Sequence, residues 1–296
     1  MKLCAQTMTV FNRMSERDGL ELFKSVGFDC LDYSMFQSVA GEFMNQPLED
    51  MLAYYRDLRA MADEIGIPFG QMHAPFIPAE GSKPDSLKPY VLRAIDACGI
   101  LGAGNLVVHH NHSRIGMFFS EDEILSSTFD YYRQFIPRAL ERGVTICVEN
   151  LPYYADKNRR FIPSPLSTPG GMNLLIDRLN DFAGEQRFKA CLDIGHAALL
   201  DDSAPSMVRR LSRNLGCLHV QDNDFAHDSH IMPFYGKTNV IGVCKALRDM
   251  GYDGAFTFEC EESILCFPTA LLPDALRLLH SVGRYLISIV EGKAEP

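Results

Sequence analysis

The sequence predicts an α/β fold, a (β/α)8 TIM barrel that occupies residues 1–296 as a single domain. Three observations support this prediction. Glycines that close helix-like segments recur about every 37 residues, which divides the chain into about eight units. Each unit pairs one short apolar segment with one amphipathic segment. Polar residues gather where the apolar segments end.

The recurring glycines indicate where helices end, because glycine readily adopts the left-handed conformation that terminates a helix. We expect this role for seven of them: Gly27, Gly66, Gly102, Gly143, Gly184, Gly216 and Gly251. Residues 48–65, 87–101 and 276–290 place apolar side chains three and four positions apart, as on the buried face of a helix.

The predicted strands are short and almost continuously apolar, which is typical of parallel strands covered by helices on both faces. They are residues 3–8, 30–33, 69–73, 106–109, 144–149, 191–193, 217–220 and 255–259. An open doubly wound sheet is the alternative, but no GxGxxG motif follows a strand. The least regular segment, residues 151–169, follows the fifth strand, and we expect a loop there, either a lid over the site or a solvated loop.

The composition disfavours several classes of protein. Hydrophobic residues make up 47% of the chain and charged residues 22%, which is typical of a folded domain rather than a disordered one. The net charge of -10 disfavours nucleic acid as a partner. We expect no membrane span and no secretory signal, because no long apolar run is present. The nine cysteines are scattered without a CxxC pair, as expected of a reduced cytoplasmic protein.

Polar side chains close several of the apolar strands, at the end of a barrel where active sites are built. Three carboxylates, Glu149, Asp193 and Glu259, end the fifth, sixth and eighth strands, and His219 lies in the seventh. Burying such carboxylates unpaired is costly, and together they would repel one another. A divalent cation resolves this conflict, and the donor set suits Mn²⁺, Mg²⁺ or Zn²⁺. A polar site without a metal is the alternative.

Several motifs make the sequence resemble a known family. They are Val148-Glu149-Asn150, CLDIGH at 191–196, HVQDN at 219–223, DSHIMP at 228–233 and Phe258-Glu259. Over nearly its whole length the chain resembles the sugar isomerase/epimerase superfamily with the xylose isomerase-like TIM barrel, which also contains the endonuclease IV enzymes. This resemblance implies that one metal ion is held by Glu149, Asp193, His219 and Glu259. It also implies that the two glutamates move protons on opposite faces of a substrate.

The resemblance carries an alternative as well. In endonuclease-like members, three zinc ions are held by these four residues and by five more, which are matched here by His73, His109, His196, Asp228 and His230. In epimerase-like members, His196 would contact a substrate oxygen instead. The chain departs from the family at Phe234, where glycine is usual, and at Phe225, where some ketose epimerases carry arginine.

We therefore expect a metal-dependent isomerase or epimerase of a small sugar, sugar phosphate or polyol. Glu149 and Glu259 would be catalytic, by moving a proton next to a metal-bound carbonyl. The alternatives are a dehydratase or lyase on a similar substrate, an endonuclease IV-like phosphodiesterase with up to three zinc ions, and a noncatalytic sugar-binding protein. The expected partner is a small carbohydrate, and the resembled family also forms homo-oligomers.

Overall fold

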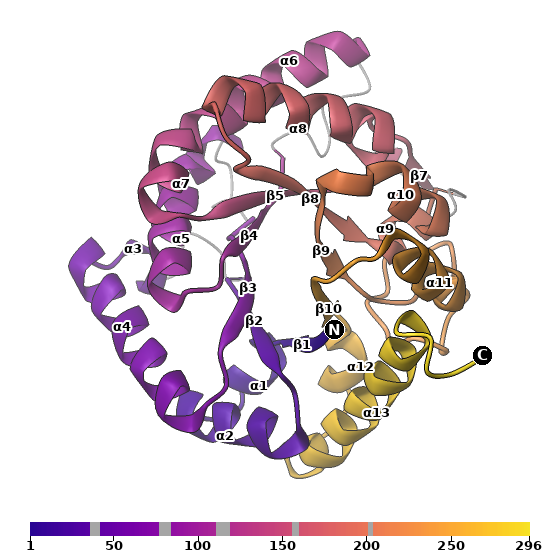
Figure 1. Cartoon of the computed structure of the whole chain (residues 1–296). Helices are drawn as coiled ribbons and strands as arrows, with labels where there is room; N and C mark the ends of the chain where they lie inside the picture. The colour runs from indigo at the N-terminus through magenta and orange to yellow at the C-terminus, as the bar shows by residue number, and fades with distance from the viewer. Residues whose placement is uncertain (36–41, 77–83, 111–118, 156–159, 201–203) are drawn as a thin grey trace.

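The computed structural model describes residues 1–35, 42–76, 84–110, 119–155, 160–200 and 204–296. In this part of the chain, parallel strands form a ring at the centre and helices surround them (Figure 1). The predicted α/β barrel is confirmed.

Eight strands of the described residues form the ring, in the order β10-β1-β2-β3-β4-β5-β8-β9. Their bounds are β1 (Lys2–Gln6), β2 (Cys30–Ser34), β3 (Phe69–His73), β4 (Asn105–Val108), β5 (Thr145–Glu149), β8 (Phe188–Asp193), β9 (Leu215–His219) and β10 (Ala255–Phe258). Just beyond β9, Val220 forms a parallel bridge with Phe258 of β10. This bridge closes the ring.

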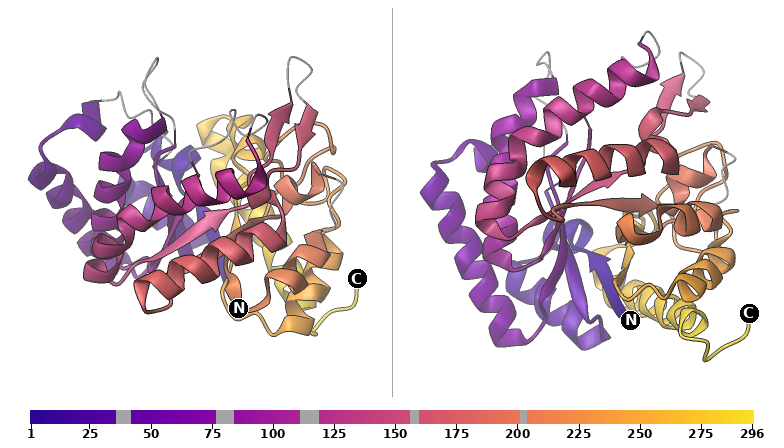
Figure 2. Two further views of the ribbon diagram at one scale, coloured as in Figure 1. Left: turned by 90° about the horizontal axis from the view of Figure 1, so that it is seen from above. Right: turned by 45° about the horizontal axis from the view of Figure 1, so that its top comes forward.

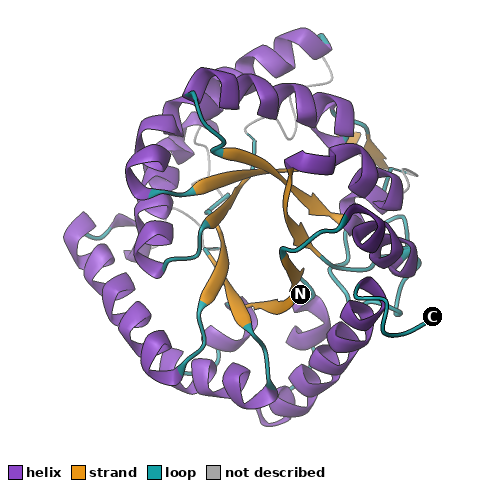
Figure 3. Ribbon diagram, viewed as in Figure 1, coloured by secondary structure: helices purple, strands orange, loops and turns teal. Residues whose placement is uncertain are grey.

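The helices form the outer layer (Figure 3). Their bounds are α1 (Met8–Phe11), α2 (Glu16–Val26), α3 (Glu42–Asn45), α4 (Leu48–Ile65), α5 (Lys88–Leu101), α6 (Glu121–Tyr132), α7 (Ile136–Arg142), α8 (Pro169–Ala183), α9 (Ile194–Ala198), α10 (Ala204–Leu211), α11 (Val240–Met250), α12 (Glu261–Leu265) and α13 (Leu272–Val290). In α4, the buried residues Met51, Tyr55, Leu58 and Ala62 are three or four positions apart. Such spacing gives the helix one apolar face toward the strands.

Glycine ends six helices, as the sequence predicts. These glycines all have positive φ, and they are Gly27, Gly66, Gly102, Gly143, Gly184 and Gly251. The prediction is wrong for Gly216, which lies inside β9. A Cβ atom at Gly216 would lie 2.4 Å from the Cβ of Lys189 on the neighbouring β8, so glycine is needed there for close strand packing. The turn after α10 uses Ser212 instead, which has a φ of 50°.

The described part of residues 151–169, which leaves out 156–159, is more regular than the sequence predicts. β6 (Tyr153–Ala155) and β7 (Arg160–Ile162) form an antiparallel ribbon, and a 3-10 helix, Pro165–Ser167, follows. The ribbon stands at the end of the barrel opposite the amino terminus (Figure 2, left). Because β1 starts at the amino terminus, the ribbon flanks the carboxyl end of the parallel strands.

Most buried apolar side chains belong to one core between the strands and the helices. A smaller cluster consists of Val107, Cys147, Cys191 and Cys217, from four adjacent strands. All nine cysteines are free, and eight of them are buried. Among the described residues, no helix combines the length and the apolar character that crossing a membrane requires.

Candidate functional site

The predicted ligands of a single cation meet at the carboxyl end of the barrel. Glu149, Asp193 and His219 are the last residues of β5, β8 and β9, and Glu259 directly follows β10. All four are buried, and each offers a ligand atom within 4.8 Å of the others. We call this group of four the cation site.

His219 is the centre of the cation site. Its Nδ1 atom lies 3.2 Å from Oε1 of Glu149 and 3.1 Å from Oε2 of Glu259. Atoms that each bind one cation at about 2.1 Å are themselves about 3 Å apart. The separations and the mixture of carboxylate and imidazole donors therefore fit a divalent cation of the kind that the sequence predicts.

The charges of the cation site are strongly coupled. Burial disfavours the charged form of Glu259 and raises its pKa to about 7. Burial has the same tendency at Glu149, but His109 and His219 outweigh it and hold the pKa of Glu149 well below its usual range. Burial tends to lower the pKa of His219, yet the surrounding acidic groups raise it. An imidazole therefore favours the charged form of each of the two glutamates, a role that a cation can take over.

Hydrogen bonds from neighbouring residues orient Asp193. Asn150 accepts from the backbone N–H of Asp193 at 2.6 Å and donates to its carbonyl oxygen at 2.9 Å. The amide of Gln221 donates to both carboxylate oxygens of Asp193 at 3.3 Å, and to Asp228 at 2.9 Å. A Cβ atom on Gly195 would lie 2.3 Å from the amide carbon of Gln221, which explains why glycine occupies this position of the motif.

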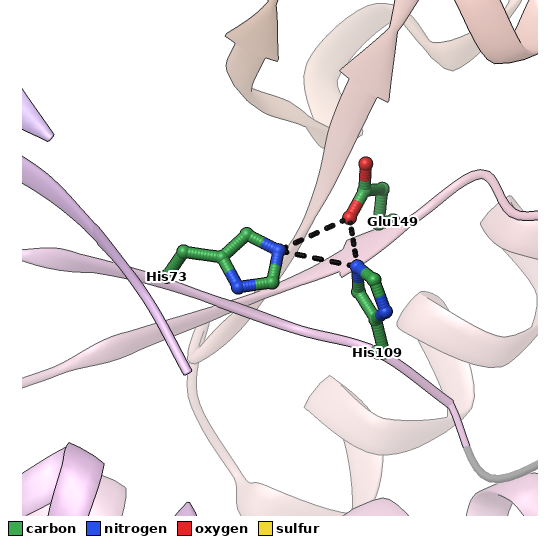
Figure 4. A group of neighbouring side chains, drawn as sticks. All are labelled: His73, His109 and Glu149. Carbon is green, nitrogen blue, oxygen red and sulfur yellow. Dashed lines mark hydrogen bonds and ion pairs between the residues drawn. The ribbon is translucent and has the colours of Figure 1, made fainter. Parts of the chain in front are cut away.

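A second group of potential ligands shares Glu149 (Figure 4). The Nε2 atom of His109 lies 2.7 Å from Oε2 of Glu149, and Nε2 of His73 lies 3.5 Å from the same oxygen. The two Nε2 atoms are 3.1 Å apart. Nδ1 of His73 faces the carbonyl oxygen of Ala74 at 2.7 Å, and donating that hydrogen bond would leave the lone pair of a neutral ring on Nε2, facing Glu149.

A third group of potential ligands, Asp193, His196 and His230, also lies beside Glu149. Asp228 contacts Nε2 of His196 at 3.2 Å through one oxygen and Nε2 of His230 at 3.3 Å through the other. Nδ1 of His196 lies 3.4 Å from Glu149. Burial opposes protonation of His196, but Asp193 and Asp228 outweigh it and raise its pKa to about 10. The five further residues that the resemblance indicates are thus all next to the cation site.

Asp222 organises the segment that carries Asp228 and His230. Its Oδ1 accepts hydrogen bonds from the backbone N–H of Asn223 and Thr238, and its Oδ2 accepts from Phe234 and Gly236, all at 2.8–3.0 Å. These bonds join the two ends of a loop of about 16 residues. One buried carboxylate therefore holds the loop in shape.

The same loop contains three strained backbone positions, of which one is His230, with a φ of 42°. Phe225 and Phe234 have φ values of 71° and 81°, in the left-handed region that favours glycine. Phe234 is the position where the resembled family usually has glycine, and its conformation explains that preference. Both aromatic rings are about half exposed, and the ring of Phe234 lies 6.2 Å from that of Tyr285 on α13.

A cavity of about 390 Å³ opens above these groups. One part of its wall is polar, with His73, His109, Glu149, His196, Asp228, His230 and Glu259, and another part is apolar, with Phe76, Leu87, Leu151, Pro152 and Phe161. The five residues that were expected to be near the cation site all line this cavity. Asp193 and His219 lie beneath its floor, with exposures of 0%.

Sequence reasoning missed several polar residues of this region, among them Glu261, Asp32 and Gln71. Glu261 lines the cavity, and its Oε1 lies 3.3 Å from Nδ1 of His230. Asp32, on β2, lies 3.5 Å from Nε2 of His219, and Gln71, on β3, donates to Asp32. A polar residue within an otherwise apolar strand was the available signal for Asp32. Nothing local distinguishes Glu261 from the exposed Glu262 beside it.

Comparison with known proteins places this barrel in a family. Residues 20–282 match the family model of the xylose isomerase-like TIM barrel, and the chain belongs to this family.

Solved structures with the same fold include sugar epimerases. A D-tagatose 3-epimerase-like protein is 20% identical, with a TM-score of 0.73 over 99% of each chain. A D-psicose 3-epimerase crystallised in the presence of D-fructose is 16% identical, with a TM-score of 0.69 over 97% of this chain and 99% of that one. At these identities the likeness shows the fold alone.

Curated relatives match a shorter part of the chain. An uncharacterised protein of Sinorhizobium fredii (strain NBRC 101917 / NGR234) is 27% identical over 167 residues, which are 56% of this chain and 50% of that protein. The chain spans about half the length of the curated relatives it matches.

Proposed function

We propose that this protein is a metal-dependent epimerase or isomerase of a small sugar or polyol, which moves a proton at the carbon next to a carbonyl. One observation carries the proposal. Glu149 and Glu259 come from different sides of the barrel, line the same cavity, and both point at Nδ1 of His219. Two carboxylates around one cation site are what proton removal and return at a single carbon require.

Each residue has a distinct part in this reaction. One glutamate removes the carbon-bound proton, and the other returns a proton to the opposite face, which inverts the carbon. Asp193 and His219 would hold a divalent cation with the two glutamates. When bound, the cation acts as a Lewis acid that stabilises negative charge on the substrate. His196 lines the cavity beside Glu149, where its ring can donate to a substrate oxygen.

The cavity supports a carbohydrate as the substrate class. Its polar wall offers hydrogen-bond partners for hydroxyl groups, whereas Phe76 and Phe161 offer flat apolar surface for the C–H face of a sugar. The solved structures with this fold include proteins described as epimerases of tagatose and psicose. These descriptions support the proposal at the level of substrate class.

Proton exchange tests the proposed function directly. The purified protein, loaded in turn with Mn²⁺, Mg²⁺ and Zn²⁺, is incubated with a panel of ketoses and aldoses in deuterated water. We expect one sugar to lose a carbon-bound proton and to give an epimer or isomer, as followed by NMR. Deuterium exchange with loss of water would assign a dehydratase. No exchange in any sugar with any of the cations would contradict the proposal.

A second candidate function rests on the three adjacent ligand groups. Besides the cation site, His73, His109 and Glu149 form one group, and Asp193, His196 and His230 form another. This arrangement favours a phosphodiesterase with several zinc ions, as in the endonuclease-like branch that the sequence resembles. Metal analysis separates the two: one ion per chain supports the epimerase, and three zinc ions with cleavage of a phosphodiester substrate support the alternative.

A further inference from the structure

A chain of buried polar side chains crosses the barrel just below the cation site. The hydroxyl of Thr257 donates to Oε1 of Gln71 at 3.3 Å, and Nε2 of Gln71 donates to Oδ2 of Asp32 at 2.9 Å. That same Asp32 oxygen lies 3.5 Å from Nε2 of His219. All four residues are at most 1% exposed, and they come from β10, β3, β2 and β9.

His219 therefore presents its two nitrogens to different partners. Nδ1 faces Glu149 and Glu259 in the cation site. Nε2, on the opposite edge of the imidazole ring, faces Asp32. A neutral imidazole has one N–H and one lone pair, and a ligand must direct its lone pair at the metal. A carboxylate next to Nε2 favours the N–H there and leaves the lone pair on Nδ1.

We infer that Asp32 is the positioning residue of the cation site: it sets the tautomer and the orientation of His219 so that Nδ1 can bind the cation. Gln71 and Thr257 hold Asp32 in place from the far side. Asp32 acts only through His219 and does not line the cavity. This inference rests on the proposed cation site, and it holds for any reaction carried out there.

Burial supports a specific role for Asp32. A carboxylate in a barrel interior costs free energy unless partners compensate it, and an apolar residue of similar size would fill the space without that cost. The carboxylate of Asp32 lies between two partners: the amide of Gln71, which donates to it, and the imidazole of His219. In other proteins, removing such a carboxylate behind a metal-binding histidine weakens metal affinity 10–100-fold as a rough range.

Metal affinity of the Asp32→Asn variant tests the inference without any substrate. Asparagine removes the negative charge beside Nε2, which weakens the preference for the N–H there and therefore for the lone pair on Nδ1. We expect the Kd for Mn²⁺, measured from the EPR signal of free Mn²⁺, to rise by about 10–100-fold. We also expect the visible absorption of bound Co²⁺, which reports ligand geometry, to differ from that of the wild type. Asp32→Ala should change both readouts in the same direction.

Thr128→Val is the matched control, because Thr128 is equally buried but lies on α6, outside this chain of polar side chains. It should keep the Kd for Mn²⁺ and the Co²⁺ spectrum of the wild type, and urea unfolding should show that all variants remain folded. A Kd for Asp32→Asn equal to that of the wild type would overturn the inference and leave the proposed function standing. A wild type that binds no cation would overturn the cation site, and both proposals with it.

One measurement needs no variant. In the wild type loaded with Zn²⁺, long-range ¹H–¹⁵N NMR identifies which nitrogen of His219 carries a proton. We expect the proton on Nε2. A proton on Nδ1 would overturn the assignment of Asp32.

Discussion

Glu149 and His219 are 70 positions apart in the chain, yet Oε1 of Glu149 lies 3.2 Å from Nδ1 of His219. The contact joins the ends of β5 and β9, which are separated in the ring by β8. The other oxygen of Glu149 lies 2.7 Å from His109. Glu149 is therefore shared between the cation site and the histidines beside it, and changes at this residue should affect both.

Replacing either glutamate with glutamine should abolish turnover without unfolding the barrel. Glutamine keeps the shape and one oxygen ligand but cannot accept a proton at neutral pH. We expect kcat to fall by a factor of about 10²–10⁴ in Glu149→Gln and in Glu259→Gln. The measurements are product formation, which gives kcat, and substrate proton exchange in deuterated water, both at saturating metal. Glu261→Gln, which changes a carboxylate of the same cavity outside the cation site, is the control and should lose less.

The two variants also show which glutamate removes the proton from one face of the substrate and which returns it on the other. Exchange that continues in one variant while product formation stops would assign the proton-removing base to the glutamate that remains. Exchange at the wild-type rate in both variants would show that neither glutamate is the base.

Asp193→Asn should act through metal affinity rather than through proton transfer. The variant loses one negative charge from the cation site, while its remaining oxygen can still accept from Gln221. We expect low activity at limiting Mn²⁺ and partial recovery at excess Mn²⁺. An activity that stays equally low at every metal concentration would contradict this role.

Removing the metal should destabilise the protein. Three carboxylates converge in the cation site, and a bound ion stabilises the folded state by mass action, by about 2.7 kcal/mol at a free concentration of 100 times its Kd. Thermal unfolding with and without a chelator checks this expectation. We expect a lower Tm after chelation, recovery when Mn²⁺ is added back, and a much smaller effect of Mn²⁺ on Asp193→Asn. An identical Tm with and without metal in the wild type would refute a resident ion.

Asp222→Asn should loosen the loop that carries Asp228 and His230. The amide offers one acceptor oxygen where the carboxylate accepts four backbone hydrogen bonds. Losing a hydrogen bond to a charged acceptor lowers the free energy of unfolding by roughly 1.5–3 kcal/mol. Hydrogen exchange should accelerate at the backbone amides of Gly236 and Thr238.

Asp224→Asn is the control for this loop, because Asp224 is exposed and its carboxylate contacts Ala226 and His227 alone among the described residues. It should leave the amides of Gly236 and Thr238 protected. Equal protection of these two amides in Asp222→Asn and the wild type would show that Asp222 does not hold the loop.

Asp96 should contribute more to stability than the exposed ion pairs do. It is 3% exposed, and it joins α5 to α7 by accepting hydrogen bonds from Arg138 at 2.8 Å and Arg142 at 2.7 Å. We expect Asp96→Asn to lower the free energy of unfolding in urea by about 1.5–3 kcal/mol. Asp63→Asn, which breaks an exposed pair with Arg59, should cost about 1 kcal/mol or less. An equal loss of unfolding free energy in Asp96→Asn and Asp63→Asn would contradict this ranking.

The sequence by itself determined the barrel and the positions of its strand ends. Apolar periodicity and the glycine at a helix end are local signals, since both reflect the conformation of neighbouring residues. They identified six helix ends, and they placed Glu149, Asp193 and Glu259 where strands finish. The helix end predicted at Gly216 was wrong, because glycine is required there by the contact with Lys189 on another strand, which is not a local signal.

Only the tertiary structure decided how these residues face one another. Which nitrogen of His219 points to the cation site depends on the side chains of four strands, and Asp32 is 187 positions away from it in the chain. The carboxylate of Glu261 lies in the cavity while that of Glu262 is exposed, because α12 turns one toward His230. Contacts of this kind are set by strand order and side-chain packing, which bring together residues that no local pattern relates.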